Sequence, residues 1–112
     1  MVIRNDTAAG YLYSLNSMLD CKGKLGYCIA RNNRLLVTEL QEYLRVRDEA
    51  ITKHGEASAI NPGMPGWDSF VAEMADLDAK EREYDFDRIS WEEASEQLTA
   101  RQLLTIEWML EG

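Results

Sequence analysis

The stretch YCIARNNRLLVTELQEYLRVRDEAITKH, from Tyr27 to His54, decides the fold class that we expect. Its apolar residues recur every three or four positions, the spacing that places side chains on one face of a helix. These residues are Ile29, Leu35, Leu36, Leu40, Tyr43, Leu44, Ala50 and Ile51. A helix of this length would extend for about 40 Å, and Gly55 could take the left-handed conformation that ends it. The sequence therefore predicts one long helix as the main element of the fold.

Shorter helical segments flank this helix on both sides. The apolar periodicity and the capping residues predict helices over Asp6–Leu19, Trp67–Glu83, Trp91–Gln97 and Ala100–Glu111. Asn5 or Asp6 can cap the first of them, and Ser90 and Thr99 begin the last two with capping boxes. The last helix is apolar on nearly every side, so it needs cover from the core or from a second copy of the chain. We therefore expect a homodimer or a higher symmetric oligomer.

Turns and loops separate these helices. Residues 20–26 contain two glycines and predict a short turn, whereas residues 55–66 contain both prolines and three glycines and predict a long loop. Residues 84–89 alternate apolar and polar side chains. We interpret them as an extended connector, because no second strand is evident to pair with them. The predicted architecture is all-α, a compact bundle of four or five helices in a single domain, residues 1–112.

The composition is that of one soluble domain. The 112 residues are 46% apolar and 29% charged, and no apolar run approaches the roughly 18 residues that span a bilayer. Two cysteines, Cys21 and Cys28, are too few to hold a secreted domain together, so we expect reduced thiols in a cytoplasmic protein. Both flank the same predicted turn, so a disulfide there is geometrically conceivable. Neither a membrane protein nor a secreted precursor is indicated.

Charge is divided unevenly along the chain. Residues 1–55 carry eight Lys or Arg against six Asp or Glu, whereas residues 56–112 carry four against fourteen. The net charge of −8 argues against nonspecific nucleic-acid binding, which depends on concentrated Lys and Arg. The two halves could attract each other within one domain, or the acidic half could present an interaction face. For an interaction face, the candidate residues are Asp78, Glu81, Glu83, Asp85 and Asp87.

The turn before the long helix is the main candidate for a ligand site. A helix N-terminus offers free backbone N–H groups to an anion, and nearby cations and an aromatic ring would suit a phosphate or a nucleotide. The candidate residues are Lys22, Lys24, Tyr27, Arg31 and Arg34. The alternative is that these cations pair with the acidic half of the same domain.

Patterns that carry catalysis or bind metals are weak. His54 is the single histidine, and its expected place at a helix end is explained by the helix dipole. The carboxylates between Glu73 and Asp87 lack the glycine and the regular spacing of a calcium loop, and no phosphate-binding or nucleophile motif occurs. We expect no enzymatic activity, no bound metal and no cofactor.

Several features of the chain occur in a recognisable order. An apolar first helix precedes a turn with Lys22 and Gly23, Arg31 opens the long helix, the third helix is acidic, and Leu98 begins a Leu-rich last helix. The apolar residues concerned are Tyr11, Leu12, Leu15 and Leu19 in the first helix and Leu35, Leu36 and Leu40 in the second, with Thr99 and Ala100 following Leu98. In this order the chain resembles a family of small phage and prophage proteins of unknown function. The loop with Pro62 and Pro65 has no match in that family.

The resemblance implies a phage context and no named catalytic residue. We expect a nonenzymatic inhibitor of a host defence system, located in the host cell cytoplasm. It would bind a host protein through the acidic face or sequester a nucleotide signal at the basic turn. The alternative is an accessory protein of phage morphogenesis or packaging, which would bind virion components. A small hydrolase or metal-dependent enzyme is disfavoured by the inventory of reactive residues.

Overall fold

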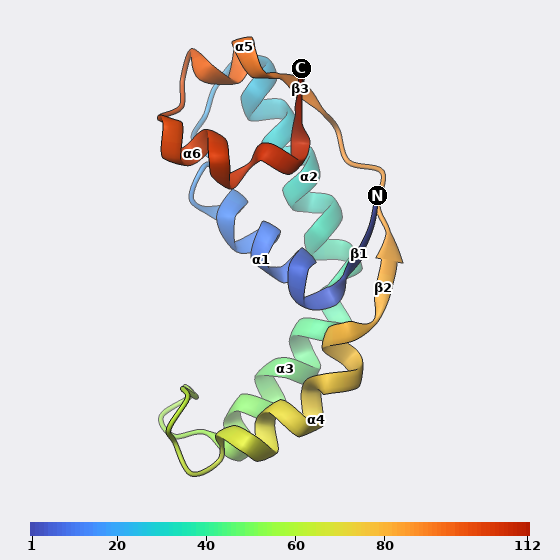
Figure 1. Cartoon of the computed structure of the whole chain (residues 1–112), viewed down its shortest axis with the longest axis vertical. Coiled ribbons are helices and arrows are strands. Elements are labelled where there is room, and N and C mark those ends of the chain that lie inside the picture. The colour runs from blue at the N-terminus through green and yellow to red at the C-terminus, as the bar shows by residue number, and fades with distance from the viewer.

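The computed structural model describes residues 1–112 and is mostly helical, with two small sheets (Figure 1). In chain order its elements are β1 (Val2–Arg4), α1 (Asn5–Asn16), α2 (Gly23–Glu39), α3 (Gln41–His54), α4 (Trp67–Ala79), β2 (Glu81–Glu83), β3 (Ile89–Ser90), α5 (Trp91–Ser95), α6 (Ala100–Thr105), the 3₁₀-helix η1 (Glu107–Met109) and β4 (Leu110–Glu111). The predicted helical fold is confirmed, but the chain is not purely all-α. The first helix ends at Asn16, three residues before the predicted end.

The predicted long helix is divided at Leu40 into α2 and α3. Leu40 has φ −95° and ψ 3°, outside the helical range, and its side chain is fully buried. The helix also begins earlier than predicted, at Gly23 instead of Tyr27. The early start has a physical cause, because the side chain of Gln97 accepts a hydrogen bond from the backbone N–H of Lys22 and donates one to its carbonyl.

The main core lies between α1, α2 and the C-terminal segment. α1 and α2 run in opposite directions, and α5 and α6 cover one end of them (Figure 1). The largest fully buried side chains are Leu15, Leu25, Ile29, Leu36, Leu40, Met74, Ile89, Ile106 and Met109. Gly26 lets the turn fold back onto α2, because a Cβ at this position would lie 2.1 Å from the carbonyl oxygen of Cys21.

α3 and α4 form a hairpin that projects from the rest of the molecule, with residues 55–66 as the loop at its tip (Figure 1). The chain measures 46 × 26 × 19 Å, and its radius of gyration is 15.9 Å. A compact domain of 100 residues has a radius of about 13 Å. The molecule is therefore more elongated than the compact bundle that we predicted.

The predicted third helix is too long, because α4 ends at Ala79 and residues 81–83 form β2. This strand pairs antiparallel with β1, and Ile3 lies opposite Arg82. Both strands have three residues, which is too few to show an alternating pattern.

The predicted last helix also ends early. It stops at Thr105, and β4 pairs in parallel with β3.

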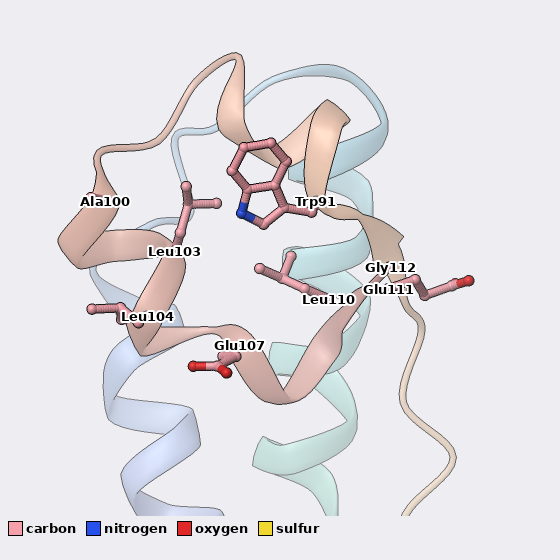
Figure 2. Close-up of a pocket in the computed structure, with 8 residues that line it drawn as sticks. All are labelled: Trp91, Ala100, Leu103, Leu104, Glu107, Leu110, Glu111 and Gly112. Atoms are coloured by element: carbon pink, nitrogen blue, oxygen red, sulfur yellow. The ribbon is translucent and has the colours of Figure 1, made fainter.

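The connector is confirmed for residues 84–88, which lie outside helices and strands. α6, η1, β4 and Trp91 surround a pocket at this end of the molecule (Figure 2).

Candidate functional site

The cations of the predicted basic site are partly paired within the chain. Lys24 Nζ lies 3.5 Å from Glu93 Oε1, and Arg31 Nη1 lies 3.2 Å from Asp87 Oδ2. The Arg31 guanidinium also lies 5.9 Å from the centre of the exposed Tyr27 ring. Two of the four predicted cations therefore already have carboxylate partners.

The predicted acidic face is paired in the same way. Glu83 Oε1 lies 3.4 Å from the amino group of Met1, and Asp78 accepts a hydrogen bond from the Tyr43 hydroxyl at 2.6 Å. Asp87 pairs with Arg31, whereas Glu81 and Asp85 have no ion-pair partner.

The two predicted sites meet in one shallow pocket of about 300 Å³. It is lined by Arg31 and Arg34 on α2 and by Asp85 and Asp87 on the connector. The charges of the two arginines and the two aspartates balance in this pocket. Lys22 and Lys24 lie outside it. This geometry favours the alternative in which the basic and acidic halves of the chain attract each other.

A larger groove, which sequence reasoning missed, lies between α1 on one side and α3 and α4 on the other. We call it the α1–α3–α4 groove; its volume is about 690 Å³. Its lining is mainly apolar and aromatic, with Leu12, Tyr13, Leu44, Trp67, Phe70 and Val71. Tyr13 is 82% exposed and Val71 45% exposed, so part of this apolar surface is open to solvent.

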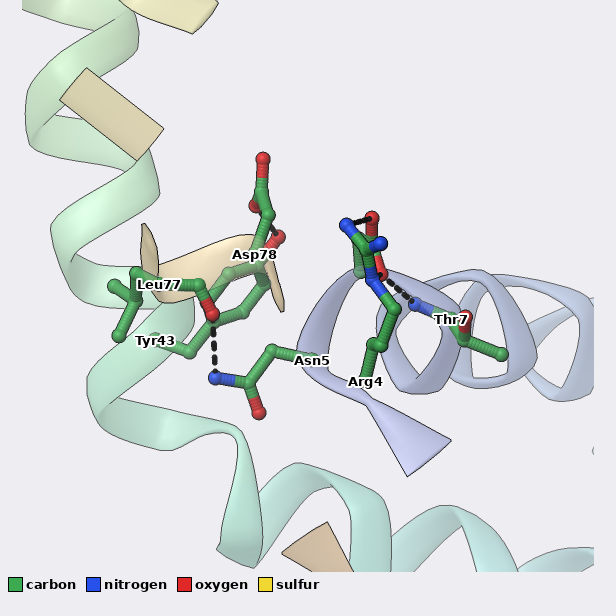
Figure 3. A network of polar contacts seen from close by, with 7 residues as sticks. Arg4, Asn5, Thr7, Tyr43, Leu77 and Asp78 are labelled. Carbon is green, nitrogen blue, oxygen red and sulfur yellow. Dashed lines mark hydrogen bonds and ion pairs between the residues drawn. The ribbon is translucent and has the colours of Figure 1, made fainter. Parts of the chain in front are cut away.

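Hydrogen bonds from Asn5 hold the two walls of this groove together. Asn5 is 1% exposed, and its side-chain amide donates to the carbonyl of Leu77 at 2.9 Å (Figure 3). Its backbone N–H donates to the carbonyl of Lys80, also at 2.9 Å. These bonds fix the start of α1 to the end of α4. Asn5, expected as a cap, is the first residue of α1. Asn5 thus ties the α1 wall of the groove to the α4 wall at this end.

Polar side chains lie at the same end of the groove. Asp6 accepts hydrogen bonds from Arg4 and from the backbone N–H of Thr7 (Figure 3). Burial, followed by the hydrogen bond to Asp78, raises the pKa of Tyr43 well above its ordinary value.

Arg47 is the cation of the groove. It lines the groove and has no carboxylate within ion-pair distance. The groove therefore combines an apolar trough with one unpaired cation and with acidic groups that are already hydrogen-bonded.

Gly10 lies in the middle of α1 and lines the groove. A Cβ built on it would meet no atom within 4 Å. Glycine inside a helix costs about 0.5–1 kcal/mol relative to alanine. The fold therefore does not require glycine here, and its effect is to leave the helix backbone open to close approach by another molecule. A glycine at the centre of a predicted helix was the one sequence signal for this groove.

The other reactive groups of the chain are His54, Cys21 and Cys28. His54 Nε2 lies 3.4 Å from Glu73 Oε1, at the end of α3. Cys21 and Cys28 are free thiols, and burial is the main cause that raises the pKa of each. No group of three or more His, Cys, Asp or Glu side chains is arranged to hold a metal ion. None of the helices has the length and apolar character needed to cross a membrane.

The chain was compared with known proteins by sequence and by structure. No protein-family model, no curated protein and no solved structure matches it. The resemblance to small phage proteins therefore stays a prediction.

Proposed function

We propose that this protein acts by binding a partner protein in the α1–α3–α4 groove, without catalysing a reaction. The observation that carries the proposal is the largely apolar groove in which Gly10 leaves the backbone of α1 uncovered. Concave apolar surfaces with a few polar groups are the usual form of binding sites.

The partner segment that fits is a helix with an apolar face. Two helical walls enclose the groove, and aromatic and aliphatic side chains line it, as in other grooves that take an amphipathic helix. The helix would bring a carboxylate opposite Arg47, which has no ion-pair partner within the chain. Close contact between its backbone and Gly10 would set the depth of binding.

The resemblance to phage proteins gives this proposal its finer form. The partner would be a protein of a host defence system, in the host cytoplasm, and binding would inhibit it. The alternative of a morphogenesis or packaging role places a virion component in the same groove. Of the two inhibitor mechanisms, protein binding is favoured over nucleotide sequestration, because Lys24 and Arg31 already have carboxylate partners.

The test is capture of a partner from a host lysate on the immobilised protein, followed by calorimetric titration of the purified partner. Gly10→Arg and Val71→Glu place a charge in the groove at exposed positions, and each is expected to weaken binding by at least about tenfold. Gly10→Ala is expected to weaken binding while raising the free energy of unfolding by about 0.5–1 kcal/mol. Opposite effects on binding and stability separate this result from general damage to the fold.

Thr7→Ala is the matched control, since Thr7 is exposed on the same helix and does not line the groove. It is expected to keep full affinity. If Gly10→Arg and Val71→Glu bind as tightly as the wild type, the groove is not the binding site. Inhibition of the captured protein's own activity supports the defence version, whereas a captured virion component supports the alternative. A nucleotide adduct in native mass spectra that Arg31→Ala removes would favour the basic turn instead.

A further inference from the structure

A second apolar pocket lies at the end of the molecule away from the α3–α4 hairpin (Figures 1 and 2). We call it the C-terminal pocket; its volume is about 490 Å³, and its apolar lining is Trp91, Ala100, Leu103, Leu104 and Leu110. Leu104 is 71% exposed and Trp91 53% exposed. No residue of this pocket belongs to the α1–α3–α4 groove, so the two surfaces are independent.

The segment that exposes the apolar side chains of the C-terminal pocket also contributes buried residues to the core. Ile106 and Met109, in the same segment, are completely buried. The capping box of Thr99 and Gln102 fixes the start of α6, and Arg88 Nη2 donates to the carbonyl of Leu110 at 2.9 Å. These contacts fix the start of α6 on one side of the pocket and Leu110 on the other.

Both charged side chains that line the pocket are acidic. Glu107 and Glu111 line it, and neither has an ion-pair partner within the chain. Glu92, next to Trp91, is exposed and also unpaired. Apolar contact area and uncompensated negative charge are thus combined on one surface, which is electrostatically complementary to a cationic ligand.

We propose that the C-terminal pocket binds a protein segment that carries an apolar side chain flanked by Lys or Arg. The apolar side chain enters between Trp91 and Leu104, and the cationic side chains meet Glu107 and Glu111. A second copy of this chain fits less well, because a symmetric contact would bring these carboxylates against their own equivalents in a molecule of net charge −8. This site adds a second docking surface to the one on which the proposed function depends.

The test uses a fluorescent peptide of about ten residues in which two leucines are flanked by lysines, titrated with the purified full chain and followed by fluorescence anisotropy. We expect saturable binding that weakens as salt rises from about 50 to about 300 mM. Leu104→Arg is expected to reduce affinity by at least about tenfold. The double variant Glu107→Lys and Glu111→Lys is expected to lose the lysine peptide and to gain binding of a matched peptide with glutamates in place of lysines.

General attraction of a cation to an acidic protein is excluded by a control with the same charge change elsewhere. Glu81→Lys with Asp85→Lys changes two exposed, unpaired carboxylates outside the pocket, and is expected to leave affinity within about twofold of the wild type. The proposal is overturned if this control weakens binding as much as the pocket variants do, or if Leu104→Arg binds normally. It is also overturned if light scattering shows a dimer that Leu104→Arg dissociates, since a second copy would then cover the pocket. Tests of the α1–α3–α4 groove use other residues, so each proposal can fail alone.

Discussion

At the scale of single residues, Asn32 joins the connector to α2. Its side chain is 2% exposed, donates to the carbonyl of Asp87 at 3.0 Å and accepts from the N–H of Asp87 at 2.8 Å. A strand would satisfy two backbone groups of residue 87 in the same way, but no strand is available there. An asparagine therefore replaces the missing strand.

Replacing Asn32 is expected to destabilise the fold strongly. Asn32→Leu leaves two backbone groups without partners, which should lower the free energy of unfolding by about 2–4 kcal/mol. Urea denaturation measures this difference. Asn33→Leu is the control, because Asn33 makes an exposed hydrogen bond to Asn16, and its effect is expected to stay below about 1 kcal/mol. Equal losses for both variants would show that Asn32 has no special role.

Tyr43 should make stability depend on pH at the alkaline end. Above pH of about 10 a tyrosine in the unfolded chain loses its proton, whereas burial and the bond to Asp78 keep Tyr43 protonated in the folded state. The unfolded state then binds fewer protons, so stability is full below this pH and falls as the pH rises.

The measurement is a series of urea titrations between pH about 9 and 11 on the wild type and on Tyr43→Phe. The fall in stability is expected to be steeper in the wild type. Tyr84, whose pKa burial also raises, is present in both proteins, so its contribution cancels in the comparison. Parallel curves would contradict the assignment to Tyr43.

At the scale of elements, the tip of the α3–α4 hairpin contains a strained turn. Ala57 and Ser58 have φ of 52° and 61°, and the backbone groups of Glu56 and Ala59 hydrogen-bond across them. Positive φ at both central positions favours Asn followed by Gly, and costs other residues about 1 kcal/mol or more each.

The double variant Ala57→Asn with Ser58→Gly is expected to raise the free energy of unfolding by about 1 kcal/mol. Thermal or urea denaturation measures the gain. Ala59→Gly, at a neighbouring residue with ordinary φ, is the control and is expected to lower stability. A loss of stability in the double variant would contradict the turn geometry.

Most helices could be predicted from the sequence because their apolar residues repeat over many turns. The break between α2 and α3 could not be predicted, since nothing local marks Leu40, which is neither glycine nor proline and yet departs from helical angles. The strands were missed because each has two or three residues and depends on a partner far away in the sequence. Tertiary contacts decide such elements, and propensity does not.

The candidate sites show the same limit. Charge counting found Arg31 and Asp87 separately but could not show that they face each other. The groove could not be predicted because its walls come from residues 6–16, 43–47 and 67–78, which meet only in the folded chain. Gly10 was visible in the sequence, but its meaning depends on the open space beside it.

At the scale of the whole molecule, the projecting hairpin has little core of its own. Its buried side chains are Tyr43, Ala50, Phe70 and Met74. Regions with few buried contacts open locally before the whole chain unfolds. We expect amide hydrogens in the outer half of α3 and α4 to exchange faster than those of α2, as measured by NMR.

Met74→Ala is expected to widen the difference in amide exchange rate between the α3–α4 hairpin and α2. Met74 is 1% exposed, and its truncation should lower the free energy of unfolding by about 2–5 kcal/mol. The first measurable effect should be faster amide exchange in α3 and α4. Val71→Ala, on the exposed side of the same helix, is the control and should leave exchange nearly unchanged. Uniformly faster exchange across α1 and α2 would show that the hairpin and the remaining core unfold together.

The pairing of β1 with β2 also limits what a nascent chain can do on the ribosome. Val2 lies opposite Glu83, Asn5 binds the carbonyls of Leu77 and Lys80, and Lys22, just before α2, is hydrogen-bonded to the side chain of Gln97. Each of these early residues emerges from the exit tunnel long before its partner has been translated. The apolar face of α1 can pack on α2 as soon as α2 has emerged, but β1 and the start of α1 stay without their partners until about three quarters of the chain has been made.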